Sequence, residues 1–294
     1  MKIAVFGQYY QSNTIEIFTK VINVLENNGA EIVIAEEFWN VLKENYATDK
    51  EYKTFKDHSD LDSSFDFLVS VGGDGTILRA ATLVRDKNIP IVGVNAGRLG
   101  FLADVQAENI ERFLPKLFIN DFKISKRTLV SLKCSPPNKD LEEINFALNE
   151  ITIARKDTTS MITIKTYLND EYLNAYWADG LIIATPTGST GYSLSCGGPL
   201  LTPTNTSFVI TPIAPHNLTA RPLVIPNDLE ISLTVSGREE HFLVSLDSRT
   251  ITVSKETSLT IKKAPFEINM VEFLEEGFLK TIRKKLLWGE DKRN

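Results

Sequence analysis

The chain of 294 residues is poor in cysteine and has no long hydrophobic run. Its two cysteines, Cys134 and Cys196, are too few for a disulfide framework or for a zinc site made of cysteine ligands. No run of about 18 apolar residues occurs, so no helix is predicted to span a bilayer. The N-terminal residues, MKIAVFGQYY, lack the apolar stretch and cleavage site of a signal peptide, which favours a cytoplasmic protein.

Basic residues are in the minority, with 32 Lys and Arg against 38 Asp and Glu and a formal net charge of -6. Nonspecific binding to duplex DNA or to an anionic membrane needs a basic face, so neither partner is expected. The three histidines, His58, His216 and His241, do not have the spacing of a metal site. The P-loop and the complete dinucleotide fingerprint are also missing. Because the Gly-x-Ser-x-Gly elbow is missing as well, a hydrolase triad is unsupported.

The patterns that are present predict two domains and a final helix. Up to residue 121, strand-like and helix-like segments alternate, which predicts an α/β domain with a mostly parallel sheet. Residues 122–269 carry short β-rich runs separated by Pro, Gly and Asn, as in an all-β domain of layered, sandwich-like sheets. Residues 270–294 contain an amphipathic helix, whose apolar stripe we expect to pack back on the first domain.

Hydrophobic periodicity also predicts individual elements. In the first domain, strands are expected at 2–7, 32–35, 67–71 and 91–94, and helices at 15–25, 76–87 and 110–119. In the second domain, alternating strands are expected at 161–168, 229–235 and 241–246. The final helix is expected to bury Val271, Leu274, Phe278, Ile282 and Leu286. Ligands of parallel sheets bind beyond the carboxyl ends of the strands, so a ligand site is expected at that edge of the predicted sheet.

The segment 72–76, Gly-Gly-Asp-Gly-Thr, lies at such a strand end and begins a predicted helix. Its glycines let the backbone approach a ligand closely, and the free N–H groups of a helix start can bind a phosphate. Asp74 among these amides can accept a proton from a substrate hydroxyl or help to hold a metal. Alternatively, the segment is a tight turn in which Asp74 caps the helix. The turn alone does not distinguish among phosphate-handling folds.

Two further segments are candidates for ligand binding. Residues 179–199, DGLIIATPTGSTGYSLSCGGP, are dense in Thr, Ser and Gly within the β-rich region. Their hydroxyls and amides can bind ribose, phosphate or an adenine edge, or they form an ordinary polar loop between two strands. Asn149-Glu150 precedes a strand-like run at 151–154. Taken alone, such a pair is ordinarily a solvated turn.

Together, these segments resemble the motif series of the NAD kinases. Segments 72–76, 95–104 (NAGRLGFLAD), 149–150 and 179–199 follow the order of that family, and the resemblance covers residues 2 to 287. Diacylglycerol kinases, sphingosine kinases and phosphofructokinases carry turns like the first segment, whereas TPTGSTGYSLSCGGP is far more specific. The resemblance implies a bacterial-type, ATP-dependent kinase that phosphorylates the 2′-hydroxyl of the adenosine ribose of NAD and makes NADP.

The resemblance also implies roles for single residues. Asp74 would be the general base that takes the proton of the 2′-hydroxyl. The positions implied to bind phosphate are Gly72, Gly73, Gly75 and Thr76. The positions implied to contact NAD are Asp74, Gly75, Arg79, Phe101, Asn149, Glu150, Asp179, Thr187, Thr190, Gly191, Tyr192, Ser195, Ala214 and Arg249.

Subsites follow from the same resemblance. Phe101 would contact the adenine, Asn149 and Glu150 the ribose of the nicotinamide half, and Asp179 the nicotinamide side. Many relatives have Ala where this chain has Gly191, so that wall of the adenine subsite is expected to differ.

The implied substrates are NAD and ATP, and the implied assembly is a homodimer or a homotetramer. A triphosphate donor needs Mg²⁺ or Mn²⁺, and because the sequence shows no carboxylate cage, the metal is expected to arrive with the nucleotide. Two other functions stay open. A lipid kinase shares the turn but would need a basic or apolar membrane-facing surface. A nucleotide sensor without turnover gains little from Asp74 beside phosphates. The sequence leaves open the donor range, polyphosphate included, the choice between NAD and NADH, and feedback by NADP.

Overall fold

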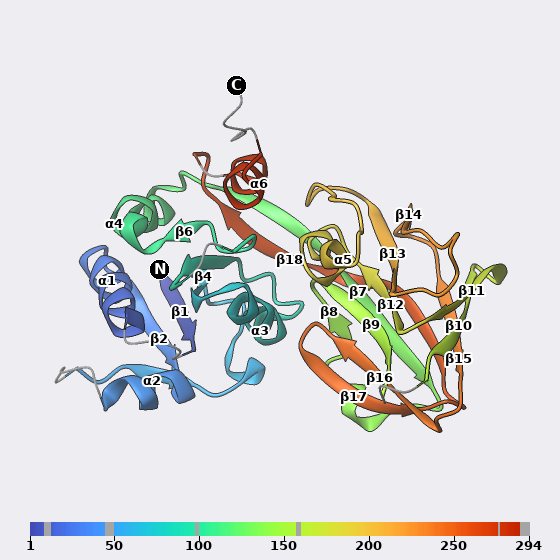
Figure 1. Cartoon of the computed structure of the whole chain (residues 1–294). Helices are drawn as coiled ribbons and strands as arrows, with labels where there is room; N and C mark the ends of the chain where they lie inside the picture. The colour runs from blue at the N-terminus through green and yellow to red at the C-terminus, as the bar shows by residue number, and fades with distance from the viewer. Residues whose placement is uncertain (9–12, 45–49, 98–99, 157–159, 276, 289–294) are drawn as a thin grey trace. The chain divides into compact units, whose positions relative to one another are not determined.

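The computed structural model describes residues 1–8, 13–44, 50–97, 100–156, 160–275 and 277–288. The chain forms two compact units (Figure 1). Unit 1 consists of residues 1–126 and 268–294, and unit 2 of residues 127–267. The chain therefore leaves unit 1 once and returns to it for its last segment.

Unit 1 is built on a parallel sheet with the strand order β3-β2-β1-β4-β5. Its strands are β1 (Lys2–Gly7), β2 (Glu31–Ala35), β3 (Lys53–Phe55), β4 (Phe67–Gly72), β5 (Ile91–Asn95) and the short β6 (Val105–Gln106). Every residue of β4 is buried, as expected for a central strand with helices on both faces. The four strands predicted for this region are confirmed, whereas β3 and β6 were not predicted.

Helices cover this sheet, with α1 and α4 on one side and α3 on the other (Figure 1). The helices are α1 (Asn13–Asn27), α2 (Glu36–Lys43), α3 (Asp74–Val84), α4 (Ile110–Phe113) and α6 (Phe278–Leu286), with 3-10 turns η1 (His58–Asp60), η2 (Ala107–Asn109) and η3 (Leu114–Ile119). Helix α2 was missed by the sequence patterns, although its Phe38 and Trp39 are core residues.

Two helix predictions need correction. The helix expected at 110–119 is a short α-helix followed by the 3-10 helix η3, which has Pro115 in its first turn and so lacks an N–H there. The final helix does not begin near Val271, because strand β18 (Ser258–Glu272) continues to Glu272 and pairs Met270 with Ile91 of β5. Pairing with a distant strand overrides the helical spacing of the apolar residues.

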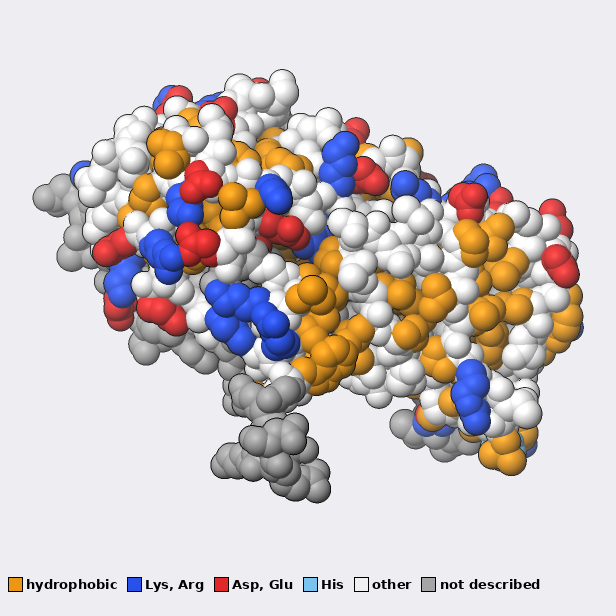
Figure 2. All heavy atoms as spheres, turned by 90° about the horizontal axis from the view of Figure 1, so that it is seen from above, with side chains coloured by type: hydrophobic (Ala, Val, Ile, Leu, Met, Phe, Trp, Pro, Cys, Tyr) orange, Lys and Arg blue, Asp and Glu red, His pale blue; other side chains and the backbone are white. Residues whose placement is uncertain are grey.

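Helix α6 belongs to unit 1, as the amphipathic pattern predicted. Ile282 is buried, and Lys285 Nζ lies 4.9 Å from the ring centroid of Phe101. Before the helix begins, Glu275 forms ion pairs with Arg112 and Lys116. Figure 2 shows a group of Lys and Arg side chains on one face of the molecule, and the last turn of α6 carries three basic residues that suit its negative end.

Unit 2 is a layered β-domain, as predicted. One sheet is antiparallel with the order β14-β13-β12-β9-β16-β17, and a second contains β11-β10-β15-β18, with β7 beside β18 and β8 beside β7. The strands not yet bounded are β7 (Lys123–Ser135), β8 (Phe146–Ala147), β9 (Glu150–Arg155), β10 (Ile162–Leu168), β11 (Glu171–Ala178), β12 (Gly180–Ala184), β13 (Ser207–Ile213), β14 (Leu223–Pro226), β15 (Ile231–Ser236), β16 (His241–Leu246) and β17 (Arg249–Ser254).

Alternating apolar residues of both sheets form one hydrophobic core in unit 2. Ile162 and Ile164 of β10, Ile231 and Leu233 of β15, and Ile153 of β9 all belong to this cluster. The structure thus confirms the buried faces that the period-2 pattern of the sequence predicts for these strands. The connection after β12 carries the short helices η5 (Gly188–Thr190) and α5 (Tyr192–Ser195), and η4 (Lys139–Leu141) lies before β8.

Candidate functional site

Asp74 stands at the carboxyl end of β4 and is the first residue of α3. Its half-buried carboxylate accepts the backbone N–H of Phe101 through Oδ2 at 2.8 Å and that of Leu102 through Oδ1 at 3.1 Å. The N-cap position is Gly73, without a side-chain cap bond. The alternative in which Asp74 only caps the helix is therefore wrong, because its carboxylate holds a separate segment of the chain.

Gly100 packs closely against the Asp74 carboxylate. A Cβ added to Gly100 would lie 1.8 Å from Oδ1 of Asp74, so a larger residue there would displace the carboxylate. Within the described part of the chain, no heavy atom lies within 4 Å of a Cβ added to Gly73 or Gly75. The carboxylate is thus held by the backbone amides of residues 101 and 102, and the described residues leave the glycine turn beside it uncovered. Arg98 and Leu99 of the NAGRLGFLAD segment lie outside the described residues.

Arg79, also on α3, lines a pocket of about 420 Å³ in unit 1. Gly7, Ala35 and Phe55, the last residues of β1, β2 and β3, line the same pocket, so it lies at the carboxyl edge of the parallel sheet. The Arg79 guanidinium is 3.9 Å from Glu37 and half of its side chain is exposed. A cation in this place can meet an anionic ligand, although its ion pair with Glu37 offsets part of the charge.

In unit 2, Asn149 and Glu150 lie where β9 begins. The antiparallel register places Glu150 opposite Ala184, so the turn that follows β12 lies directly beside the pair. Thr185 donates its backbone N–H to the Asn149 carbonyl at 2.8 Å and its hydroxyl to the Leu148 carbonyl at 2.6 Å. Glu150 is only 9% exposed, so the interpretation of this pair as a solvated turn is wrong.

Three buried polar atoms in this part of unit 2 have no hydrogen-bond partner among the described residues: Asn149 Oδ1, Glu150 Oε2 and Thr187 Oγ1. Buried polar atoms are normally paired, so such a group points to a ligand. Burial, and after it the nearby charge of Asp247, raises the pKa of Glu150 to about 8, against which the backbone N–H of Tyr192 acts. Glu150 therefore carries a proton at neutral pH and can donate as well as accept.

The turn after β12 packs closely on this pair. A Cβ on Gly188 would lie 2.1 Å from the Asn149 carbonyl oxygen, and a Cβ on Gly191 would lie 3.0 Å from Glu150 Oε2. Thr190 donates its hydroxyl to the Thr187 carbonyl at 3.0 Å. The tertiary structure thus brings together the two unit 2 segments, 149–150 and 187–191, that the sequence analysis had singled out separately.

Sequence profiles of both domains of one family match this chain. The ATP-NAD kinase N-terminal domain matches residues 3–122, and the ATP-NAD kinase C-terminal domain matches residues 148–273. The chain belongs to the ATP-NAD kinase family. The family predicted from the sequence motifs is therefore confirmed.

Relatives in the ATP-NAD kinase family match along the whole chain. NAD kinases of Flavobacterium psychrophilum, Christiangramia forsetii and Bacteroides fragilis are 64%, 52% and 43% identical to it, each over 100% of both chains. An NAD kinase from Archaeoglobus fulgidus, solved in complex with ATP, has a TM-score of 0.76 at 26% identity and 98% and 99% coverage. Yeast NADH kinase complexed with NADH has a TM-score of 0.84 at 21% identity, covers 99% of this chain and 88% of its own, and shares the fold.

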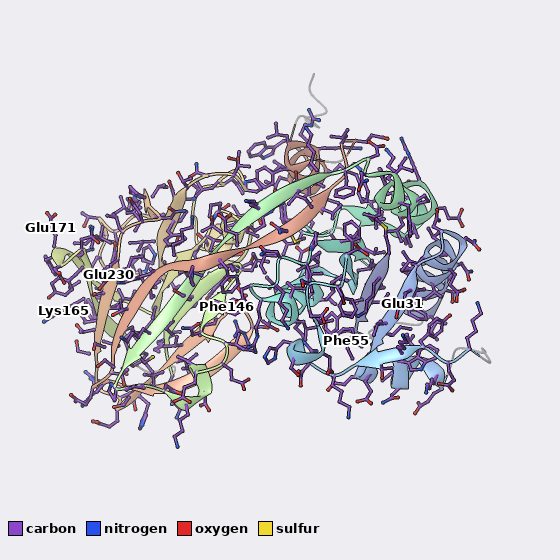
Figure 3. All side chains as sticks on the ribbon, turned by 180° about the vertical axis from the view of Figure 1, so that it is seen from behind. Glu31, Phe55, Phe146, Lys165, Glu171 and Glu230 are labelled. Carbon is purple, nitrogen blue, oxygen red and sulfur yellow. The ribbon has the colours of Figure 1, made fainter. Side chains whose placement is uncertain are left out.

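The remaining family positions lie in varied surroundings. Tyr192 and Ser195 of α5 are exposed, and Asp179 forms an ion pair with Arg155 at 3.1 Å. Arg249 donates to the backbone carbonyls of Ile144, at 2.9 Å, and Phe146, which is labelled in Figure 3. These bonds anchor the chain before β9. Ala214, the last of these positions, is exposed just after β13 and has a left-handed φ of 43°.

One residue near the site was missed by the sequence analysis. Asp247, in the turn between β16 and β17, accepts the backbone N–H groups of Leu148, Asn149 and Glu150. A single Asp in a hairpin turn is an ordinary turn residue, so the sequence held no signal for this contact.

The described residues hold no cluster of three or more His, Cys, Asp or Glu side chains that could bind a metal ion. Likewise, no helix among those residues is long and apolar enough to cross a membrane.

Proposed function

We propose that this member of the ATP-NAD kinase family transfers the terminal phosphoryl group of ATP to the 2′-hydroxyl of the adenosine ribose of NAD. The products are NADP and ADP, and the proton of the hydroxyl goes to Asp74, which acts as the general base. The observation that carries this role is the Asp74 carboxylate, held at the end of a central strand by two backbone amides beside a glycine turn that no described side chain covers.

The chemistry suits this arrangement. A ribose hydroxyl is a poor nucleophile at neutral pH, and a fixed carboxylate acceptor contributes about 10²–10⁴-fold to such a step. A carboxylate has roughly four lone-pair sites, so the two amide bonds of Asp74 orient it and leave room for the substrate hydroxyl. Phosphoryl transfer otherwise depends on positioning and charge neutralisation, for which the turn at Gly72, Gly73, Gly75 and Thr76 offers the start of α3 to phosphate.

Asn149 and Glu150 would bind the ribose hydroxyls of the nicotinamide half of NAD. Their Oδ1 and Oε2 atoms, which have no partner among the described residues, support this role, because each ribose hydroxyl both donates and accepts a hydrogen bond. With its pKa raised to about 8, the Glu150 side chain can donate as well as accept a hydrogen bond to a ribose hydroxyl. The adenine and its ribose would then lie along Thr187, Thr190, Gly191, Tyr192 and Ser195.

The other assigned contacts are proposals from the family resemblance. Arg79 would face phosphates, and its place in a pocket at the carboxyl edge of the sheet supports that role. Phe101 would contact the adenine, and Asp179 the nicotinamide side. Ala214 and Arg249 complete the proposed set, although the hydrogen bonds of Arg249 described above go to the backbone of unit 2.

Mg²⁺ or Mn²⁺ would arrive with ATP as part of the substrate. Bound to the triphosphate, the ion neutralises the charge that develops on the transferred group. Mg²⁺ sites commonly combine few protein carboxylates with substrate phosphates and waters, so this chain need not supply a dedicated cage. The assembly, proposed as a homodimer or homotetramer, is measurable by light scattering, and the cytoplasmic location by fractionation of the native cell.

Incubation of the protein with NAD, Mg²⁺ and a panel of donors tests the proposal directly. We expect NADP to form with ATP. Parallel reactions with other nucleoside triphosphates and with polyphosphate define the range of donors, and reactions with NADH in place of NAD define the range of acceptors. Tight NAD binding without product under any donor would identify a nucleotide sensor instead. Phosphorylation of diacylglycerol vesicles, with none of NAD, would identify a lipid kinase.

A further inference from the structure

The turn between β16 and β17 grips the segment that carries Asn149 and Glu150. Asp247 Oδ1 accepts the N–H of Asn149 at 2.8 Å and of Glu150 at 3.2 Å, and Oδ2 accepts that of Leu148 at 2.9 Å. In return, the Asp247 backbone N–H donates to the Glu150 carbonyl at 3.0 Å. Four hydrogen bonds thus join one turn residue to three successive residues that lie about one hundred positions earlier in the chain.

We propose that Asp247 is a positioning residue for NAD binding, which acts by fixing the backbone at 148–150 so that the Asn149 and Glu150 side chains face the ligand. This inference rests on the proposed role of those two residues. Asp247 would not touch NAD itself.

The backbone on both sides of the pair supports this role. The carbonyls of Leu148 and Asn149 are bound by Thr185, while the three N–H groups are bound by Asp247. The backbone of the pair is therefore occupied by protein partners, whereas Asn149 Oδ1 and Glu150 Oε2 have none in the part of the chain that the structure describes. Such a division leaves the side-chain atoms for a ligand and prevents the backbone from turning to satisfy them.

Arg249 also holds the backbone of this segment in place. It lies two residues after Asp247 and donates to the carbonyls of Ile144 and Phe146, so the hairpin holds the chain both before and at the pair. Pairing of Leu246 with Ile151 then continues the contact into β9. The hairpin thus determines where β9 begins, which decides the direction of the Glu150 side chain.

The charge of Asp247 affects the pKa of Glu150, which a residue that only stabilises the fold would not do. After burial, Asp247 is the second cause that raises the pKa of Glu150. Burial raises the pKa of Asp247 itself, whereas its three backbone N–H partners and the charge of Arg249 lower it. Tyr192 and Cys196 are coupled to Glu150. Asp247→Asn keeps the size and one amide-accepting oxygen but removes the charge, so it should lower the pKa of Glu150.

The test compares full-length wild type, Asp247→Asn, Asp247→Ala and a control, Asp170→Asn. Asp170 is an exposed turn residue of unit 2 that also has a left-handed φ, of 66°, so it matches Asp247 in backbone and charge. We expect Asp247→Asn to raise KM for NAD about tenfold, the size of one lost charged hydrogen bond. Its kcat and its KM for ATP should change less than about twofold, and the pH at which KM for NAD changes should fall. Asp170→Asn should match wild type.

Asn149→Ala and the double variant Asn149→Ala/Asp247→Asn separate the possible failures. If Asp247 acts through Asn149 and Glu150, the effects on KM are less than additive. If Asn149→Ala raises KM for NAD and Asp247→Asn does not, the inference is wrong while the proposed function stands. If neither changes KM for NAD, the assigned ribose site is wrong and the inference falls with it. Equal losses in kcat and in both KM values for Asp247→Asn would indicate a merely structural residue and would overturn the inference. If Asp247→Ala does not fold, the milder Asp247→Asn decides the matter.

Discussion

Glu150→Gln should remove a pH dependence of stability that the wild-type protein shows between pH 6 and pH 9. The side chain is buried, and its pKa is raised from 4.5 to about 8, first by burial and then by the charge of Asp247. Gln keeps the size of the side chain and both polar ends but does not titrate. The substitution therefore isolates the contribution of one proton.

The sign follows from the two pKa values. Above about pH 4.5 the unfolded chain loses this proton, while the folded protein keeps it until about pH 8. Between these values the folded state binds more protons, so rising pH lowers the free energy of unfolding by about 1.4 kcal/mol per pH unit. The loss ends above pH 8, and between pH 6 and pH 9 it amounts to about 3 kcal/mol.

Thermal unfolding at pH 6, 7.5 and 9 measures this effect. A change of about 3 kcal/mol corresponds to roughly 6–12 °C in Tm for a protein of this size. Other titrating groups affect both proteins alike, so the quantity to compare is the difference between wild type and Glu150→Gln at each pH. Glu142→Gln serves as the control, because Glu142 is an exposed carboxyl group of the same unit. It should follow the wild type at every pH.

Parallel Tm curves for wild type and Glu150→Gln would refute the reasoning. That result would mean that Glu150 is ionised in the folded protein at neutral pH, with its charge solvated or paired. The proposed match between a protonated Glu150 and a ribose hydroxyl would then be lost as well.

Three further substitutions test the rest of the site. Asp74→Ala should lower turnover at least about 10²-fold while calorimetry still detects NAD binding, and near-normal turnover would exclude the base role. Gly100→Ala should also abolish most turnover, because its Cβ would lie 1.8 Å from Asp74 Oδ1, whereas Gly277→Ala, in open space, should have wild-type kinetics. If both alanine variants are equally active, the 100–102 backbone does not hold the carboxylate. Gly191→Ala places a Cβ 3.0 Å from Glu150 Oε2, so a several-fold change in KM for NAD is expected without a loss of kcat.

Local patterns predicted the elements whose partners are near in sequence. Strands β1, β4 and β5 are short apolar runs, and α1 follows its 3.6-residue spacing to a stop at Gly29, which has a left-handed φ of 75°. The predicted start of the final helix was wrong because β18 pairs with β5, and no pattern within residues 268–272 reveals a partner near residue 91. A helical stripe and a strand buried on one face can share the same residues over such a short window.

The sequence by itself determined the family, the two-domain order, and the place of Asp74 at the end of a buried strand, because these depend on motifs and on periodicity along the chain. Only the tertiary structure decided the burial, the hydrogen-bond partners and the neighbouring charges of the acidic groups. The amides that hold Asp74 come from 27 and 28 residues away, and those that hold Asp247 from 97 to 99 residues away. Burial and charge at Glu150 arise where strands β9, β12 and β16 pair. Such effects are sums over neighbours in space, and a chain read residue by residue does not specify which neighbours those are.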